Sequence, residues 1–207
     1  MPTFHIADFE PQGGVVHLHG DARKDAERTI TTNHYLRSVP SGKSHYLALD
    51  GALLVWSIPA NKNISNFLLG GGGGFSVWDL SRLWAPPGHA DNLLTRIISS
   101  SVNWVRAAEN PDAVVSYADP NHDHLGGVYR AASWVYTGQS EETRVYRDNA
   151  TSLTVSRRAF HSGGVNLTRA QIEAKGFTQE KLPGKLRFAR PLTRRGKRAF
   201  RVKWEVV

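Results

Sequence analysis

Short apolar runs broken by turn residues are the main pattern in the first third of the chain. Two such runs, at residues 45–49 and 52–58, flank an Asp-Gly dipeptide at 50–51, which favours a two-residue β-hairpin turn. Before them, Asp21 is a plausible N-cap for a helix over residues 22–30. This part of the chain therefore predicts a helix followed by an antiparallel hairpin.

The longest helical pattern lies in the middle of the chain. Apolar side chains recur there at helical spacing, at Leu93, Leu94, Ile97, Ile98, Val102 and Val105. They predict a helix over about residues 92–108, between a strand at 75–83 and a short apolar strand at 113–117. The elements predicted next are a short helix and two strands, at residues 126–133, 134–137 and 143–147. Helices that alternate with strands around one hairpin indicate an α/β domain over residues 1–150, with a mixed sheet flanked by helices.

Composition limits what the chain can do. It contains no cysteine, which excludes disulfides, iron–sulfur clusters and thiolate chemistry. It has no run of about 18 apolar residues, so no membrane span is expected, and its start lacks the features of a signal peptide. These features favour a cytoplasmic protein. Five consecutive glycines at 70–74 predict a linker-like loop rather than a phosphate loop, because no Lys-Ser/Thr pair follows them.

Positive charge is concentrated near the C-terminus. Residues 151–207 carry 14 Lys/Arg against three Asp/Glu, whereas residues 1–150 carry a small net negative charge. We therefore treat 151–207 as a basic C-terminal extension that packs on the same domain. Such asymmetry favours a polyanionic partner, although a solvated basic surface would look the same. The candidate nucleic-acid contacts are Arg187, Arg190, Arg194, Arg195, Lys197, Arg198 and Arg201.

Potential acid–base groups follow the predicted strand at 113–117. Asp119 comes just past its carboxyl end, where ligands bind in open α/β sheets. His122, Asp123 and His124 follow in the same loop, and carboxylates and imidazoles are donors for divalent metals. The spacing matches no strict metal motif. The alternatives are that Asp119 caps the next turn and that the other side chains are simply solvated.

The residues after this loop could receive an anion. Gly126 and Gly127 permit close backbone approach at a helix start, where free N–H groups favour negative charge. Helix–sheet packing also requires small residues, so that interpretation stays open. Tyr129, one turn further, is either a site residue or a core tyrosine with a satisfied hydroxyl.

Three patches carry a family resemblance. The most specific is SYADPNHDHLGGVYRAASWVYTG (116–138), with Ser-Tyr-Ala-Asp, a histidine-containing loop, Gly-Gly-x-Tyr-x-Ala and Trp-x-Tyr-x-Gly. NHYLRSVPSGKSHYLALDGALLV (33–55) and DLSRLW (79–84) are weak alone, but their order strengthens them. Together these patches resemble the Mom family of phage DNA-modification proteins. The order of elements also resembles that of the acetyltransferase (GNAT) superfamily.

The resemblance implies a phage-encoded enzyme with a GNAT-like mixed sheet, active in the host cytoplasm. Such an enzyme would add a carbamoylmethyl group to the N6 amine of adenine in double-stranded DNA and so protect the DNA from restriction. The base would have to leave the duplex to react. An iron centre is a further candidate. The implied catalytic residues are Asp119, Tyr129, His124, His34 and Tyr35. The candidate metal ligands are Asp119, Tyr129 and Tyr46.

The donor side departs from the acetyltransferase pattern. Coenzyme A binding in that superfamily uses Gln/Arg-x-x-Gly-x-Gly/Ala, whereas this chain has Ala-Pro-Pro-Gly-His-Ala at 85–90. The two prolines lack the N–H groups that would hold a pyrophosphate. Acetyl-coenzyme A and an aminoacyl carrier are therefore both candidate acyl donors. The candidate donor-binding residues are Arg82, Gly88, Ala90, Gly126 and Gly127.

Two other functions remain open at this point. An acetyltransferase that acts on a small amine or a protein would have been favoured by an intact pyrophosphate loop. A DNA-binding protein without catalysis would account for the basic segment alone. That second alternative predicts that Asp119→Ala leaves all activity intact.

Overall fold

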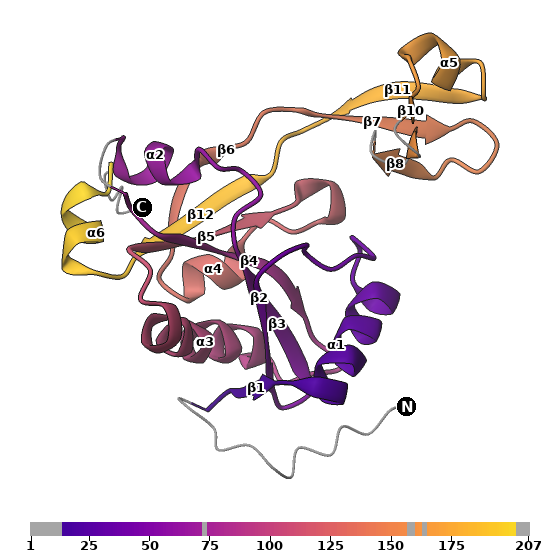
Figure 1. Cartoon of the computed structure of the whole chain (residues 1–207). Helices are drawn as coiled ribbons and strands as arrows, with labels where there is room; N and C mark the ends of the chain where they lie inside the picture. Colours follow the sequence, from indigo (N-terminus) through magenta and orange to yellow (C-terminus); the bar gives the residue numbers. More distant parts are fainter. Residues whose placement is uncertain (1–13, 72–73, 157–159, 163–164, 202–207) are drawn as a thin grey trace.

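A computed structural model describes residues 14–71, 74–156, 160–162 and 165–201 (Figure 1). A seven-stranded mixed sheet forms the body, with strand order β1-β2-β3-β4-β5-β12-β6. Neighbouring strands pair antiparallel except β4 and β5, which are parallel. In chain order these strands are β1 (Val16–Leu18), β2 (Ser44–Leu49), β3 (Ala52–Ser57), β4 (Val77–Trp84), β5 (Ala113–Ala118), β6 (Val135–Gln139) and β12 (Leu186–Pro191).

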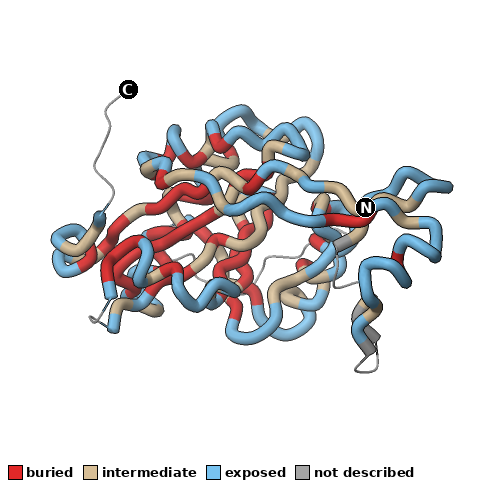
Figure 2. Tube along the Cα trace, turned by 90° about the horizontal axis from the view of Figure 1, so that it is seen from above, coloured by how far each residue is buried: buried red, intermediate tan, exposed pale blue. Residues whose placement is uncertain are grey.

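Helices cover both faces of this sheet, which confirms the predicted α/β arrangement. They are α1 (Gly20–Asn33), α2 (Ile64–Leu69), α3 (Leu93–Glu109), α4 (Gly127–Ala131) and α6 (Arg194–Ala199). Helices α3 and α4 pack on one face, over a core that contains Leu47, Leu54 and Trp56. Tyr46 and Val55 alternate with those residues along β2 and β3, so their side chains point to the opposite face. Helix α1 covers that face. Figure 2 shows the buried residues gathered along the strands.

The apolar pattern located the hairpin and the long helix correctly. Asp50 and Gly51 form the turn between β2 and β3, and α3 occupies the predicted span. Helices α2 and α6 were not predicted. Helix α6 is short and mostly charged, and its first turn is held by Thr193, whose hydroxyl accepts from the N–H of Gly196. In the glycine run, positions 72–73 lie outside the described residues. No helix in the described part of the chain has the length and apolar character that a bilayer span requires.

The C-terminal part of the chain completes the main sheet. Strand β12 lies between β5 and β6, and its Phe188 and Ala189 are fully buried. Residues between β6 and β12 form an arm that projects from the body (Figure 1). Its elements are β7 (Thr143–Asp148), β8 (Thr154–Ser156), β9 (His161–Ser162), β10 (Val165–Asn166), α5 (Arg169–Glu173) and β11 (Phe177–Leu182). The expected boundary at residue 150 falls within this arm, because β7 lies before it and pairs with β11, which lies after it.

Candidate active-site cavity

A cavity opens where β4 and β5 diverge at the carboxyl end of their parallel pair. The two strands pair from Val77 and Ala113 as far as Leu80 and Ser116. Beyond that point the register of β4 against β3 shifts at Ser81, a β-bulge of the kind that bends a strand. The cavity has a volume of about 620 Å³. Its position at the carboxyl ends of these strands makes it the candidate active site.

Residues from both faces of the sheet line this cavity. Consecutive residues 80–85 contribute from β4 and its end, and Tyr117 and Ala118 contribute from β5. Successive strand residues point to opposite faces, so the cavity passes through the plane of the sheet. Two ligands could therefore meet there from opposite sides. Of the residues predicted from the sequence, the cavity brings together His34, Tyr35, Arg82, His124, Gly126, Gly127 and Tyr129.

His34 and Tyr35 follow α1 and form a stacked pair at the cavity wall. Their ring centroids lie 4.5 Å apart at an angle of 28°. The Nδ1 atom of His34 accepts a hydrogen bond from the N–H of Leu36 at 3.1 Å, which leaves the imidazole proton on Nε2. Burial, together with the positive charge of Arg82, lowers the pKa of His34 to about 4. At neutral pH His34 is therefore an uncharged N–H donor.

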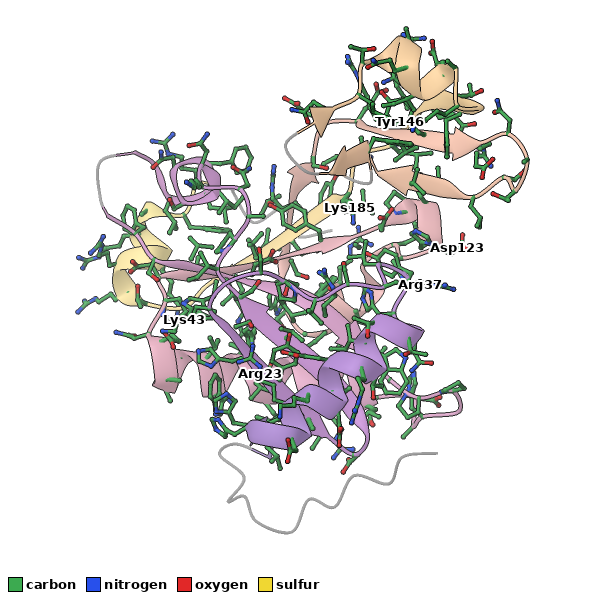
Figure 3. The ribbon with its side chains drawn as sticks, turned by 45° about the vertical axis from the view of Figure 1, so that its right-hand side comes forward. Arg23, Arg37, Lys43, Asp123, Tyr146 and Lys185 are labelled. Carbon is green, nitrogen blue, oxygen red and sulfur yellow. The ribbon has the colours of Figure 1, made fainter. Side chains whose placement is uncertain are left out.

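Tyr35 also contacts the loop that follows β5. Its ring centroid lies 4.3 Å from that of His122 and 5.3 Å from that of His124. The Nζ atom of Lys185, which precedes β12, lies 5.6 Å from the same ring. Burial, reinforced by the negative charge of Asp119, raises the pKa of Tyr35 to about 12. Figure 3 shows Lys185 on the side of the body nearest the arm. The fold thus gathers these side chains from three separate segments around a neutral phenol.

Asp119 is buried beside the cavity and is not among the residues that line it. Its Oδ1 accepts from the backbone N–H of Asn121 at 3.1 Å and from the Asn121 side-chain amide at 2.9 Å. Its Oδ2 lies 3.0 Å from Nζ of Lys185. Burial alone would raise the pKa of Asp119, but Lys185 and Asn121 outweigh it and lower the pKa below its usual value. Asp119 therefore caps the turn that follows it, as one of the two sequence-based alternatives predicted. A carboxylate stabilised in this way is a weak base.

Tyr129 is among the residues that line the cavity, and its hydroxyl faces β5. The hydroxyl oxygens of Tyr129 and Ser116 lie 2.8 Å apart, and the Ser116 Oγ lies 2.7 Å from the carbonyl oxygen of Leu80. Because a carbonyl can only accept, Ser116 donates to Leu80 and accepts from Tyr129. Burial raises the pKa of Tyr129 well above its usual value, so the side chain is a neutral phenol. This geometry matches the alternative of a core tyrosine with a satisfied hydroxyl.

The predicted metal ligands are not brought together. Tyr46 packs under α1, on the opposite face of the sheet from Tyr129, with the guanidinium of Arg23 at 4.7 Å from its ring centroid. The oxygens of Asp119 and Tyr129 already have protein partners. Among the described residues, no three histidine, cysteine or acidic side chains are grouped to hold a metal ion. The three predicted ligands therefore do not fit an iron centre, and we assign no step to a metal.

The predicted donor loop borders the cavity between β4 and α3. Ala85 and His89 line it, whereas Gly88 and Ala90 flank His89 without lining it. Helix α3 begins after Asn92, whose side chain forms no capping hydrogen bond. The first N–H groups of this long helix are therefore without a side-chain cap near the cavity, and the positive end of the helix dipole favours an anion there.

Arg82 is held by the chain itself, although it lines the cavity. Its Nε donates to the carbonyl oxygen of Ser38 at 2.7 Å, and its Nη1 donates to the carbonyl oxygen of Ser81 at 2.6 Å. The bond to Ser38 ties β4 to the segment that follows His34 and Tyr35. Arg82 therefore supports the cavity wall, and less of its guanidinium is left to bind an acidic donor.

Asp79 is a half-buried acid that was not singled out from the sequence. It lies on β4, before the bulge, and its Oδ1 is fully buried without a hydrogen-bond partner among the described residues. Burial raises the pKa of Asp79 to about 7, against the opposing charges of Arg82 and Lys185. The available signal was a single acid between the apolar residues Trp78 and Leu80.

The predicted nucleic-acid residues divide into buried and exposed groups. Arg187 is buried, donates to the hydroxyl and carbonyl oxygens of Thr137 at 3.1 and 3.0 Å, and stacks over Phe67 at 3.8 Å. It therefore stabilises the β12–β6 pair and is poorly placed to contact DNA. Arg195 lies over the ring of Phe75 at 4.3 Å. The remaining candidates are half-buried or exposed near α6, at Arg190, Arg194, Lys197, Arg198 and Arg201.

Comparison with known proteins supports the family resemblance that the sequence patches carry. No curated protein matches the chain. Residues 18–206 match the Mom protein family, and this match covers every strand of the main sheet except part of β1. It also covers the whole cavity, the arm and α6. Membership in this family points to DNA adenine modification of the phage type. The chain belongs to the Mom protein family.

Proposed function

We propose that this protein transfers a carbamoylmethyl group to the N6 amine of adenine in double-stranded DNA. The observation that carries the proposal is the cavity between β4 and β5, which holds His34, Tyr35 and His124 in a chain of the Mom family. A volume of about 620 Å³ lies within the range of about 300–1,000 Å³ that is typical of small-ligand sites. Modification at N6 would protect the DNA from restriction.

In this proposal the adenine leaves the base stack, at a cost of a few kcal/mol, and enters the cavity. The uncharged His34 donates a hydrogen bond from its Nε2–H to an acceptor atom of the base. Tyr35 borders the base as an aromatic wall. N6 then attacks the donor carbon. A bond forms between N6 and that carbon, and the leaving group departs with the bonding electron pair. The imidazole of His124, which lines the cavity, accepts the proton that N6 loses.

Mass spectrometry of host DNA tests this function. The full chain is expressed in bacteria, and the DNA is digested to nucleosides and compared with DNA from cells that carry an empty vector. Wild-type protein is expected to produce carbamoylmethyl-deoxyadenosine. His124→Ala is expected to reduce its yield by about 100- to 10,000-fold, the contribution of a positioned base.

His19→Ala, an exposed histidine before α1, is the matched control and is expected to keep the wild-type yield. Unmodified deoxyadenosine in cells with soluble, folded wild-type protein would contradict the proposed function. Acetyl-deoxyadenosine in place of the carbamoylmethyl product would contradict the proposed donor group. If His124→Ala matches the wild type, His124 is not the base.

A further inference from the structure

A second cavity, which we call the basic cavity, lies at the opposite end of α3 from the active-site cavity. Its volume is about 730 Å³. Four cationic side chains line it, from α3, the end of β12 and the α6 region: Arg106, Arg190, Lys197 and Arg201. The described residues that line it include no acidic side chain. The fold therefore concentrates positive charge in one concave site.

These cations are not neutralised by the part of the chain that the structure describes. Among the described residues, none of the four forms an ion pair. The nearby acids are occupied: Glu109 binds Lys43 and His45, and Asp112 accepts from the hydroxyl of Thr193 at 2.7 Å. Like charges held close together repel each other, so an anion in the cavity would relieve that repulsion.

Local geometry keeps two of the guanidinium groups at the cavity. Arg190 donates through Nη1 to the carbonyl oxygen of Ala132 at 3.3 Å, which leaves its other N–H groups available. The guanidinium of Arg201 lies against Gly70, where a Cβ atom would be 2.6 Å from its Nη2. Gly70 thus makes room for Arg201. A planar guanidinium with several free N–H groups is suited to phosphate oxygens.

The spacing between the two cavities fits a nucleic-acid backbone. Leu94 lines the active-site cavity and Arg106 lines the basic cavity, at opposite ends of the same helix. Their separation of twelve residues corresponds to about 18 Å at a rise of about 1.5 Å per residue. For a duplex that runs along α3, this span corresponds to about five base pairs at about 3.4 Å each. The exposed Arg194 and Arg198 on α6 extend the positive surface around the opening.

We propose that the basic cavity binds a backbone phosphate of the DNA, about five base pairs from the adenine held in the active-site cavity. This inference rests on the proposed function, because it takes DNA as the substrate. It adds Arg106, which lies outside the basic C-terminal segment, to the DNA-binding residues, and it excludes Arg187. The phosphate would position the duplex without contributing base specificity.

DNA-binding measurements at several salt concentrations test this site. Arg106→Gln/Lys197→Gln removes two exposed charges from the basic cavity, and Lys24→Gln/Arg28→Gln removes two from α1. Fluorescence anisotropy with a duplex of about 25 base pairs gives Kd for each variant and for the wild type. The cavity variant is expected to bind about tenfold more weakly at low salt, and its slope of log Kd against log salt should fall by about 1. The α1 variant should keep the wild-type slope.

A methylphosphonate scan identifies the phosphate itself. One uncharged linkage, about five base pairs from the target adenine, should weaken binding to the wild type but not to the cavity variant. Equal slopes for the two variants, or a linkage effect that persists in the cavity variant, would overturn the proposal. Circular dichroism confirms that both variants are folded. Wild-type protein that leaves adenine unmodified would contradict the proposed function instead, whichever slopes are measured.

Discussion

Replacing Asp79 with asparagine is expected to increase the free energy of unfolding at pH 8 by about 4 kcal/mol. Burial raises the pKa of this carboxyl from 3.8 to about 7. A shift of about three units corresponds to about 4 kcal/mol, because each unit is worth about 1.4 kcal/mol. Asparagine has nearly the same shape and carries no charge, so it avoids the cost of an ionised group whose Oδ1 has no hydrogen-bond partner among the described residues.

The sign of this effect depends on pH. Between pH values of about 4 and 7, the folded protein holds a proton on Asp79 that the unfolded chain has released. The stabilising contribution is therefore complete below about pH 4 and is lost as the pH rises through about 7. Burial lowers the pKa of His17 and His34 to about 4, so these residues act in the opposite direction. The difference between wild type and Asp79→Asn isolates the contribution of Asp79.

Urea unfolding at pH 4, 6 and 8 measures this difference. Asp112→Asn is the matched control, because Asp112 is a buried aspartate that accepts hydrogen bonds from the N–H of Ser76 and the hydroxyl of Thr193. We expect Asp112→Asn to destabilise the protein by about 1–3 kcal/mol, since an amide cannot accept both bonds in the same way. A difference for Asp79→Asn that is the same at pH 4 and pH 8 would contradict the buried, raised-pKa carboxyl.

Elements with a local signal could be predicted from the sequence. The Asp-Gly turn fixes the hairpin geometry, and the apolar spacing of α3 requires a face that packs on the sheet. The loop after β5 is also local, so Asp119, His124 and Tyr129 had to lie near one another. The resemblance, rather than any periodicity, placed His34 and Tyr35 at the same site.

Features that depend on distant contacts could not be predicted. Arg187 belongs to a basic segment, and its burial became visible only when β12 was found between β5 and β6. Tyr46 and Leu47 are neighbours that point to opposite faces, and the sequence does not say which face holds the cavity. The pKa of Asp79 is likewise set by burial, which is a property of the whole fold. A functional role assigned to a side chain from local sequence alone therefore fails where distant strands decide whether the side chain is buried and which face it occupies.

Gly126→Ala is expected to destabilise the protein by about 2–5 kcal/mol, the sum of a backbone term and a packing term. Gly126 has a φ of 79°, in the left-handed region that costs alanine about 1–2 kcal/mol. A Cβ atom there would lie 2.2 Å from Cε2 of Phe188, whose side chain is fully buried and cannot move freely. The backbone between His124 and Tyr129 must therefore shift, and DNA modification should fall with stability.

Gly127→Ala provides the matched control one residue further along. A Cβ atom at Gly127 would meet no atom within 4 Å, and the residue lies in α4, where alanine is favoured by up to about 1 kcal/mol. Urea unfolding should therefore show no loss for Gly127→Ala. In Gly126→Ala/Phe188→Leu the smaller side chain relieves the clash, so the double variant should lose less stability than the two single losses added together. If Gly126→Ala unfolds like Gly127→Ala, the close contact with Phe188 does not hold the backbone between His124 and Tyr129 in place.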